Sequence, residues 1–124
     1  MVKGKQRRKK VLVVDDDEGM TMCLSDILEM KGFATRVAHD GVEAIEKVKE
    51  EKFDVVLMDI KMPRMDGIQA SKEIHALLPD MVIFLITGYS SDYESDKVVQ
   101  GCVREVISKP FDFDMLIERI NECV

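Results

Sequence analysis

Five short, mostly apolar runs constrain the fold of this chain more than any other feature. They occupy residues 11–14, 35–38, 54–58, 81–86 and 106–108. Apolar runs of this length are typical of strands that are buried on both faces of a parallel sheet. The sequence therefore predicts five strands in one sheet.

Segments with a different periodicity separate the runs. Apolar residues recur at helical spacing over residues 18–31, 42–48, 68–78 and 116–120, whereas residues 88–100 are mostly polar with a weak helical pattern. Gly32 is expected to end the first helix and Asp112 to cap the last one. Five strand–helix units of this length predict an α/β fold: a five-stranded parallel sheet with helices on both faces and right-handed crossovers.

Size and composition indicate one domain in a reducing compartment. The 124 residues are enough to bury a core. No apolar run approaches the ~18 residues of a membrane span, and no signal-peptide core follows the basic start. The three cysteines are odd in number and widely spaced, as expected for free thiols. We expect no membrane association and a cytoplasmic location.

Charge is distributed unevenly along the chain. The formal net charge of the chain is −6. Residues 1–10 carry six basic side chains and no acid, so the remaining 114 residues carry a formal charge of −12. A body this acidic repels nucleic acid, and we expect the domain itself not to bind it. Residues 1–9 are predicted to be a disordered basic tail, and residues 10–124 to be the domain.

Polar side chains stand where the predicted strands end. Asp15 and Asp16 follow the first run, Asp59 the third, Thr87 the fourth and Lys109 the fifth. Parallel strands present their carboxyl ends at one edge, which is where open α/β sheets bind ligands. Several acids, one ammonium and one hydroxyl at that edge predict a magnesium and phosphoryl site.

The carboxylates have a metal interpretation and a competing structural one. Asp16 and Asp59 fit the need of Mg²⁺ for one or two carboxylate ligands, with Asp15 acting through a bound water. The competing interpretation is that the acidic run at residues 15–18 only caps the next helix. Asp59 is the candidate nucleophile, because a carboxylate can accept a phosphoryl group when cations neutralise the transferred oxygens.

Lys109 is expected to supply one of those cations, and Thr87 a hydroxyl beside the Gly88 amide. Each has an ordinary alternative by itself. Lysine is common on solvated surfaces, and threonine is common in strands.

Four ordered motifs together resemble the receiver domain of two-component response regulators over residues 10–124. They are Val14-Asp15-Asp16-Asp17, Met58-Asp59 through Asp66-Gly67, Leu85-Ile86-Thr87-Gly88 and Ser108-Lys109-Pro110-Phe111. The resemblance implies a flavodoxin-like (βα)₅ fold. It also implies that Asp59 is the phosphoacceptor. The Mg²⁺ (or Mn²⁺) ligands would be Asp16, Asp59 and the Lys61 carbonyl, with Asp15 acting through water. Thr87, Gly88 and Lys109 would contact the phosphoryl group, Pro63 and Gly67 would shape the loop, and the Lys109–Pro110 peptide would be cis.

The same resemblance implies a regulatory phosphoacceptor that catalyses only its own phosphorylation and dephosphorylation. The phosphoryl donor would be a sensor histidine kinase or a histidine phosphotransfer protein. Residues 88–100, with the strand and helix after them, would change conformation to control an effector or a fused output domain, and a homodimer could form through the same face. Val106 departs from the pattern, because the family often has an aromatic residue at this position.

Two other functions are compatible with parts of the sequence. A haloacid-dehalogenase-type phosphatase also begins with an apolar strand and an Asp15-x-Asp17 motif, but it requires Thr or Val where this chain has Gly19. A flavodoxin-like cofactor binder would need Gly, Ser and Thr in the first loop, which is acidic here.

Overall fold

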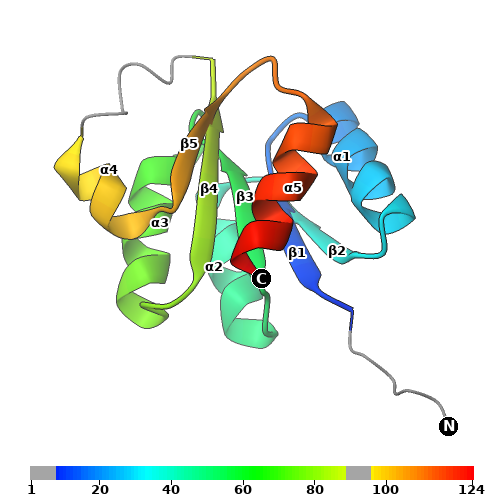
Figure 1. Ribbon diagram of the computed structural model, residues 1–124. Coiled ribbons are helices and arrows are strands. Elements are labelled where there is room, and N and C mark those ends of the chain that lie inside the picture. The colour runs from blue at the N-terminus through cyan, green and yellow to red at the C-terminus, as the bar shows by residue number, and fades with distance from the viewer. Residues whose placement is uncertain (1–7, 89–95) are drawn as a thin grey trace, which may run out of the picture.

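The computed structural model describes residues 8–88 and 96–124, without the side chain of Val98, and shows five strands alternating with five helices (Figure 1). The elements are β1 (Lys10–Val14), α1 (Glu18–Met30), β2 (Ala34–Ala38), α2 (Gly41–Glu50), β3 (Val55–Asp59), α3 (Gly67–Leu77), β4 (Val82–Thr87), α4 (Lys97–Cys102), β5 (Glu105–Ser108) and α5 (Phe113–Cys123).

All five strands pair in parallel in the order β2-β1-β3-β4-β5. The chain moves outward from β1 to β2, then crosses back over β1 to form β3. The connections after β1 and β3 consequently leave in opposite directions, which opens a crevice between the carboxyl ends of these two strands. The predicted α/β fold, with its sheet between helices, is confirmed.

Alternate residues along the central strands pack on opposite faces of the sheet. Leu12 and Val14 of β1 face α2 and α3, whereas Val11 and Val13 face α1 and α5. Figure 1 shows the same division, with α1 and α5 on one face and α2, α3 and α4 on the other. Because both faces are covered, the central strands are apolar throughout, and this is why their sequences show no alternation.

The structure differs from the sequence prediction mainly at the ends of elements. Asp59 and Thr87 are the last residues of β3 and β4 rather than the first residues after them. The helix expected within residues 88–100 is α4, which begins at Lys97 and extends two residues further, to Cys102. The Asp96 side chain accepts a hydrogen bond from the Val99 amide at 3.2 Å, so a residue directly before α4 stabilises the start of this helix. Residues 89–95 of that segment lie outside the described residues.

The predicted tail is described only at its end, since residues 1–7 lie outside the described residues. The Arg8 guanidinium donates to the Phe33 carbonyl at 3.1 Å, and the Lys9 carbonyl accepts from the Ala34 amide at 2.8 Å. The boundary at residue 10 stays a prediction. Among the helices that the structure describes, none combines the length and the apolar character needed to cross a bilayer.

Candidate functional site

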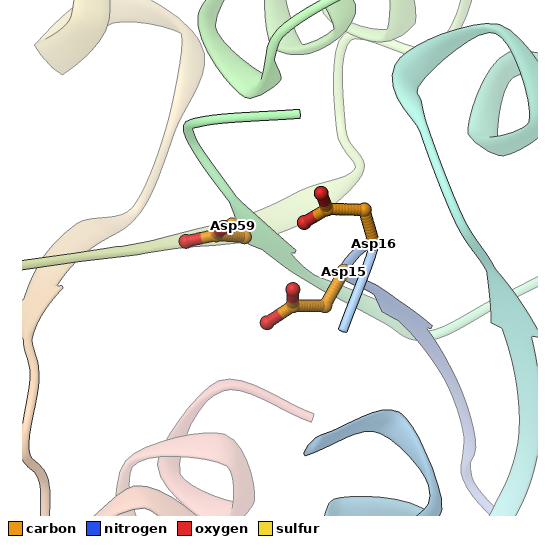
Figure 2. A group of neighbouring side chains, drawn as sticks. All are labelled: Asp15, Asp16 and Asp59. Carbon is orange, nitrogen blue, oxygen red and sulfur yellow. The ribbon is translucent and has the colours of Figure 1, made fainter. Parts of the chain in front are cut away.

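Three carboxylates meet at the carboxyl edge of the sheet, where β1 and β3 are neighbours. Asp15 and Asp16 follow β1 directly, and Asp59 ends β3 (Figure 2). Each side chain offers a carboxylate oxygen within 4.8 Å of the others. Asp15 and Asp59 are buried, with exposed fractions of 5% and 9%, whereas Asp16 faces solvent. The site therefore concentrates negative charge at the sheet edge, with two buried carboxylates and one exposed to solvent.

Lys109 brings the balancing positive charge from the other side of Asp59. Its Nζ lies 3.1 Å from Asp59 Oδ1 and 3.7 Å from Asp15 Oδ2, and its side chain is 31% exposed. Partial burial lowers the pKa of Lys109, but the hydrogen bond and charge of Asp59, and those of Asp15, outweigh that effect and raise it. Lys109 is thus held as a cation against the candidate nucleophile.

Asp15 is a carboxylate under electrostatic stress, because its surroundings disfavour its negative charge. Burial raises its pKa above the ordinary value, and the charges of Asp59 and Asp16 add to this effect. The Asp17 amide, which donates to Asp15 Oδ1 at 3.0 Å, and the Lys109 charge act in the opposite direction without cancelling it. A bound cation would relieve this stress, so the donor set fits a hard divalent ion such as Mg²⁺.

Asp17 has a separate structural task. Its side chain accepts a hydrogen bond from the Met20 amide at 3.1 Å and caps α1. The helix-start interpretation therefore explains Asp17, which caps α1, and Glu18, which lies in its first turn, whereas Asp15 and Asp16 belong to the carboxylate cluster.

Thr87 and Gly88 lie at the end of β4, the strand next to β3. The register pairs Asp59 with Ile86, so Thr87 stands one residue beyond the partner of Asp59. Its side chain is 2% exposed, and its carbonyl accepts the Lys109 amide at 2.8 Å. Gly88 follows on the surface, where a Cβ would meet no atom within 4 Å among the described residues beyond its chain neighbours. Both residues are therefore at the predicted edge, beside the strand that carries Asp59.

The connection from β3 to α3 returns immediately to the site. The Gly67 amide donates to the Ile60 carbonyl at 2.8 Å. A Cβ at Gly67 would lie only 2.3 Å from the Asp59 carbonyl oxygen, so only glycine permits this approach. Lys61 and Pro63 lie in the loop that this contact closes. The Lys109–Pro110 peptide is cis, as the resemblance implied.

One ion pair beside this loop was not anticipated from the sequence. Arg64 Nε lies 2.8 Å from Asp40 Oδ2, which joins the β3–α3 loop to the turn before α2. The two residues are 24 positions apart, and neither follows a strand in a way that marks it as a site residue. No local pattern indicates the contact.

Comparison with known proteins gives one consistent result. Residues 11–121 match the family "Response regulator receiver domain". The chemotaxis protein CheY of Bacillus subtilis is 38% identical over 114 residues, which cover 91% of this chain and 95% of that protein. The transcriptional regulatory protein ZraR of Klebsiella oxytoca is 37% identical over 92% of this chain. The chain spans about a quarter of the length of ZraR, since the match covers 26% of it.

A solved structure shows the same fold. The response regulator TrrA of Thermotoga maritima, determined in complex with Mg²⁺-BeF, superposes with a TM-score of 0.86 at 34% identity. The match covers 94% of this chain and 99% of that one. The predicted (βα)₅ arrangement is therefore shared along almost the whole chain.

Removing the buried charge of Asp15 should stabilise the metal-free protein. The folded-state pKa of Asp15 is raised, so its ionisation lowers the stability of the fold. This cost is absent below about pH 3.8, grows as the pH rises toward the folded-state pKa and is complete above it. We expect Asp15→Asn to raise Tm at pH 7 by about 4 °C, or ~1 kcal/mol, with the gain shrinking toward pH 4.

Scanning calorimetry in chelator-containing buffer from pH 4 to pH 8 measures this change. Asp17→Asn is the matched control, because asparagine caps a helix as well as aspartate and Asp17 lies outside the cluster. A lower Tm for Asp15→Asn at neutral pH would contradict the electrostatic account.

A methyl group at Gly67 should displace the backbone of the site. The contact at 2.3 Å is with backbone, which cannot rotate away, so we expect Gly67→Ala to lower the free energy of unfolding by about 2 kcal/mol. Denaturant unfolding measures it. Gly101→Ala is the control, since a Cβ there meets nothing within 4 Å and alanine favours the helix. Equal stabilities for the two variants would refute the steric argument.

Proposed function

Because the chain belongs to the response regulator receiver domain family, we propose that it accepts a phosphoryl group on Asp59 and that this reaction requires Mg²⁺. The observation that carries the proposal is the position of Asp59. It is a buried carboxylate that lies 3.1 Å from the Lys109 ammonium and within one carboxylate cluster with Asp15 and Asp16. We infer that the domain is regulatory and that its only catalysis is its own phosphorylation and dephosphorylation.

In this proposal Asp59 is the nucleophile of an in-line displacement. One of its carboxylate oxygens forms a bond to phosphorus, while the bond from phosphorus to the donor breaks and the donor atom keeps the electron pair. For a phosphohistidine donor that atom is an imidazole nitrogen. Lys109 is positioned to stabilise negative charge on the transferred oxygens, and the Thr87 hydroxyl and Gly88 amide are the proposed donors on the β4 side. Water attack on phosphorus later regenerates the Asp59 carboxylate.

The residues that would hold the metal are Asp16 and Asp59 through their side chains, the Lys61 carbonyl, and Asp15 through water. When bound, Mg²⁺ (or Mn²⁺) would neutralise charge on the phosphoryl oxygens. The three carboxylates support this assignment, since their mutual repulsion disfavours the metal-free arrangement. Pro63, Gly67 and Pro110 shape the loops on either side.

We propose that the donor is a sensor histidine kinase or a histidine phosphotransfer protein, in a cytoplasmic phosphorelay. The output is proposed to run through α4, β5 and α5, either to a separate effector or to a fused output domain, and a homodimer through that face is compatible with it. ZraR, a transcriptional regulatory protein, supports the fused case by its greater length. The receiver itself is proposed not to contact nucleic acid, because its body is acidic.

The phosphatase alternative is not favoured. Its motif needs Asp15 and Asp17 to act together, but Asp17 caps α1 while Asp15 joins Asp16 and Asp59. A flavodoxin-like cofactor-binding function is not favoured either, because the carboxylates at this edge would repel the phosphate of a cofactor.

Incubation with acetyl phosphate should label Asp59 alone. The label should require a divalent cation, because without one the negative cluster repels the donor. Borohydride trapping followed by mass spectrometry locates the acyl phosphate, and Asp59→Asn, which keeps the side-chain shape, should remain folded and unlabelled. A label on Asp15, or equal labelling in chelator, would refute the proposal.

Phosphorylation should change hydrogen exchange mainly in α4 and β5. α4 has six residues, and among the described strands β5 lies at the edge of the sheet and pairs with β4 alone, so little holds either element in place. Val106 is half-buried against the α2–α3 side of the core, in place of the aromatic residue that the family often has. We therefore expect a modest change, which is measured by comparing free and beryllofluoride-bound protein. Changes confined to α1 would contradict this output face.

A further inference from the structure

Arg64 has a backbone conformation that needs an explanation. Its φ is +63°, and among the residues that the structure describes it is the single non-glycine with a positive φ. Residues other than glycine rarely adopt this backbone conformation, and they do so where the surrounding structure restrains them. The turn around it is tight, because the Met65 amide donates to the Pro63 carbonyl at 2.6 Å. The conformation therefore requires an external restraint.

Asp40 supplies that restraint from the turn before α2. Its Oδ1 accepts the Glu43 amide at 2.8 Å and caps the helix, while its Oδ2 accepts Arg64 Nε at the same distance. The hydrogen bond from Arg64 is the largest of the causes that hold the pKa of Asp40 below its ordinary value. Since the carboxyl is buried, with 8% of its residue exposed, it presents one fixed acceptor to the loop.

A backbone contact reinforces the ion pair one residue further on. The Gly41 amide donates to the Met65 carbonyl at 3.0 Å, and a Cβ at Gly41 would lie 2.7 Å from that oxygen. The absence of a side chain at Gly41 lets the two turns touch. The β3–α3 loop is consequently fixed at two neighbouring residues, Arg64 and Met65, by two neighbouring residues of the other turn.

The far end of the same loop is fixed by Gly67, whose amide donates to the Ile60 carbonyl. Between these restraints lies Lys61, two residues after Asp59. We propose that Asp40 and Arg64 are positioning residues: they clasp the β3–α3 loop, and so set the Lys61 backbone and Asp59 for Mg²⁺ binding and phosphoryl transfer. This inference rests on the function proposed above and adds two residues to it.

Stability alone explains the ion pair poorly. The Arg64 side chain is 62% exposed, and an ion pair with so exposed a partner adds little to folding. The ion pair matters for the geometry of the loop, because it holds the backbone in a conformation that the loop would otherwise avoid. Residues that orient metal ligands without touching the metal typically matter for affinity far more than for folding.

The test measures Mg²⁺ affinity by calorimetry, because the chain has no tryptophan to report binding. The variants are Asp40→Asn, Arg64→Gly and the double variant. Asparagine keeps the cap on α2, and glycine accepts the left-handed backbone, so both variants should fold. We expect each single variant to bind Mg²⁺ about tenfold more weakly and to react correspondingly more slowly with acetyl phosphate. Because the two residues act through one contact, the double variant should bind Mg²⁺ no more weakly than the single variant with the lower affinity.

Two controls frame the result. Glu51→Gln removes a partly buried ion pair with Lys10, 2.7 Å long, at the opposite edge of the sheet, and should leave Mg²⁺ affinity unchanged. Asp16→Asn removes a proposed ligand and should abolish most of the affinity. Thermal unfolding of every variant, compared with binding measured well below Tm, separates loss of fold from loss of positioning.

The outcomes distinguish the two levels of inference. A parent protein that neither binds Mg²⁺ nor becomes phosphorylated would overturn the proposed function itself. A parent that does both, with variants that match it within twofold, would overturn the clasp alone. Lower Tm with unchanged Mg²⁺ affinity, or additive losses in the double variant, would equally overturn it. Weaker binding at unchanged Tm, with no further loss in the double variant, would establish it.

Discussion

Repulsion among three carboxylates at the junction of β1 and β3 is the interaction around which the rest of this site is arranged. Two of them are buried, and only one cation, Lys109, reaches them in the part of the chain that the structure describes. Holding like charges this close together without a counter-ion destabilises the fold, and a bound cation would offset that destabilisation. Burial raises the pKa of Asp15, and the charges of Asp59 and Asp16 act in the same direction. The cluster is compatible with the divalent cation and the phosphoryl group that we propose for this site.

Aspartates that look alike in the sequence take two different structural roles. One group satisfies free amides at helix starts, and its members are Asp17, Asp40, Asp66, Asp96 and Asp112. The other group is the cluster of Asp15, Asp16 and Asp59 at the carboxyl ends of β1 and β3. Capping holds the helices in place against the sheet edge, and the fixed edge holds the cluster together. Asp40 serves both ends, because it caps α2 with one oxygen and restrains the β3–α3 loop with the other.

Much of the fold and most of the site could be predicted because their signals are local. Apolar runs mark the strands, and the polar residue at each carboxyl end marks the edge, so Asp15, Asp59 and Lys109 could be brought together without coordinates. The prediction was less accurate at α4, whose six residues bury little, so that its apolar pattern was too short to define its bounds. The structure brings the site side chains to one edge, but the chemical roles assigned to all the site residues stay predictions, since they depend on a bound metal and phosphoryl group.

The sequence by itself determined the order of elements, the parallel sheet and the residues at its carboxyl edge, because each follows from periodicity within a few residues. Only the tertiary structure separated the two neighbouring roles within the acidic run: Asp17 caps α1, whereas Asp15, two residues earlier, joins the carboxylate cluster. It also decided that Arg64 is held in a left-handed conformation by Asp40, across 24 residues. Such a contact depends on how two turns approach each other in space, and that approach is fixed by the packing of α2 and α3 on the sheet rather than by any local propensity.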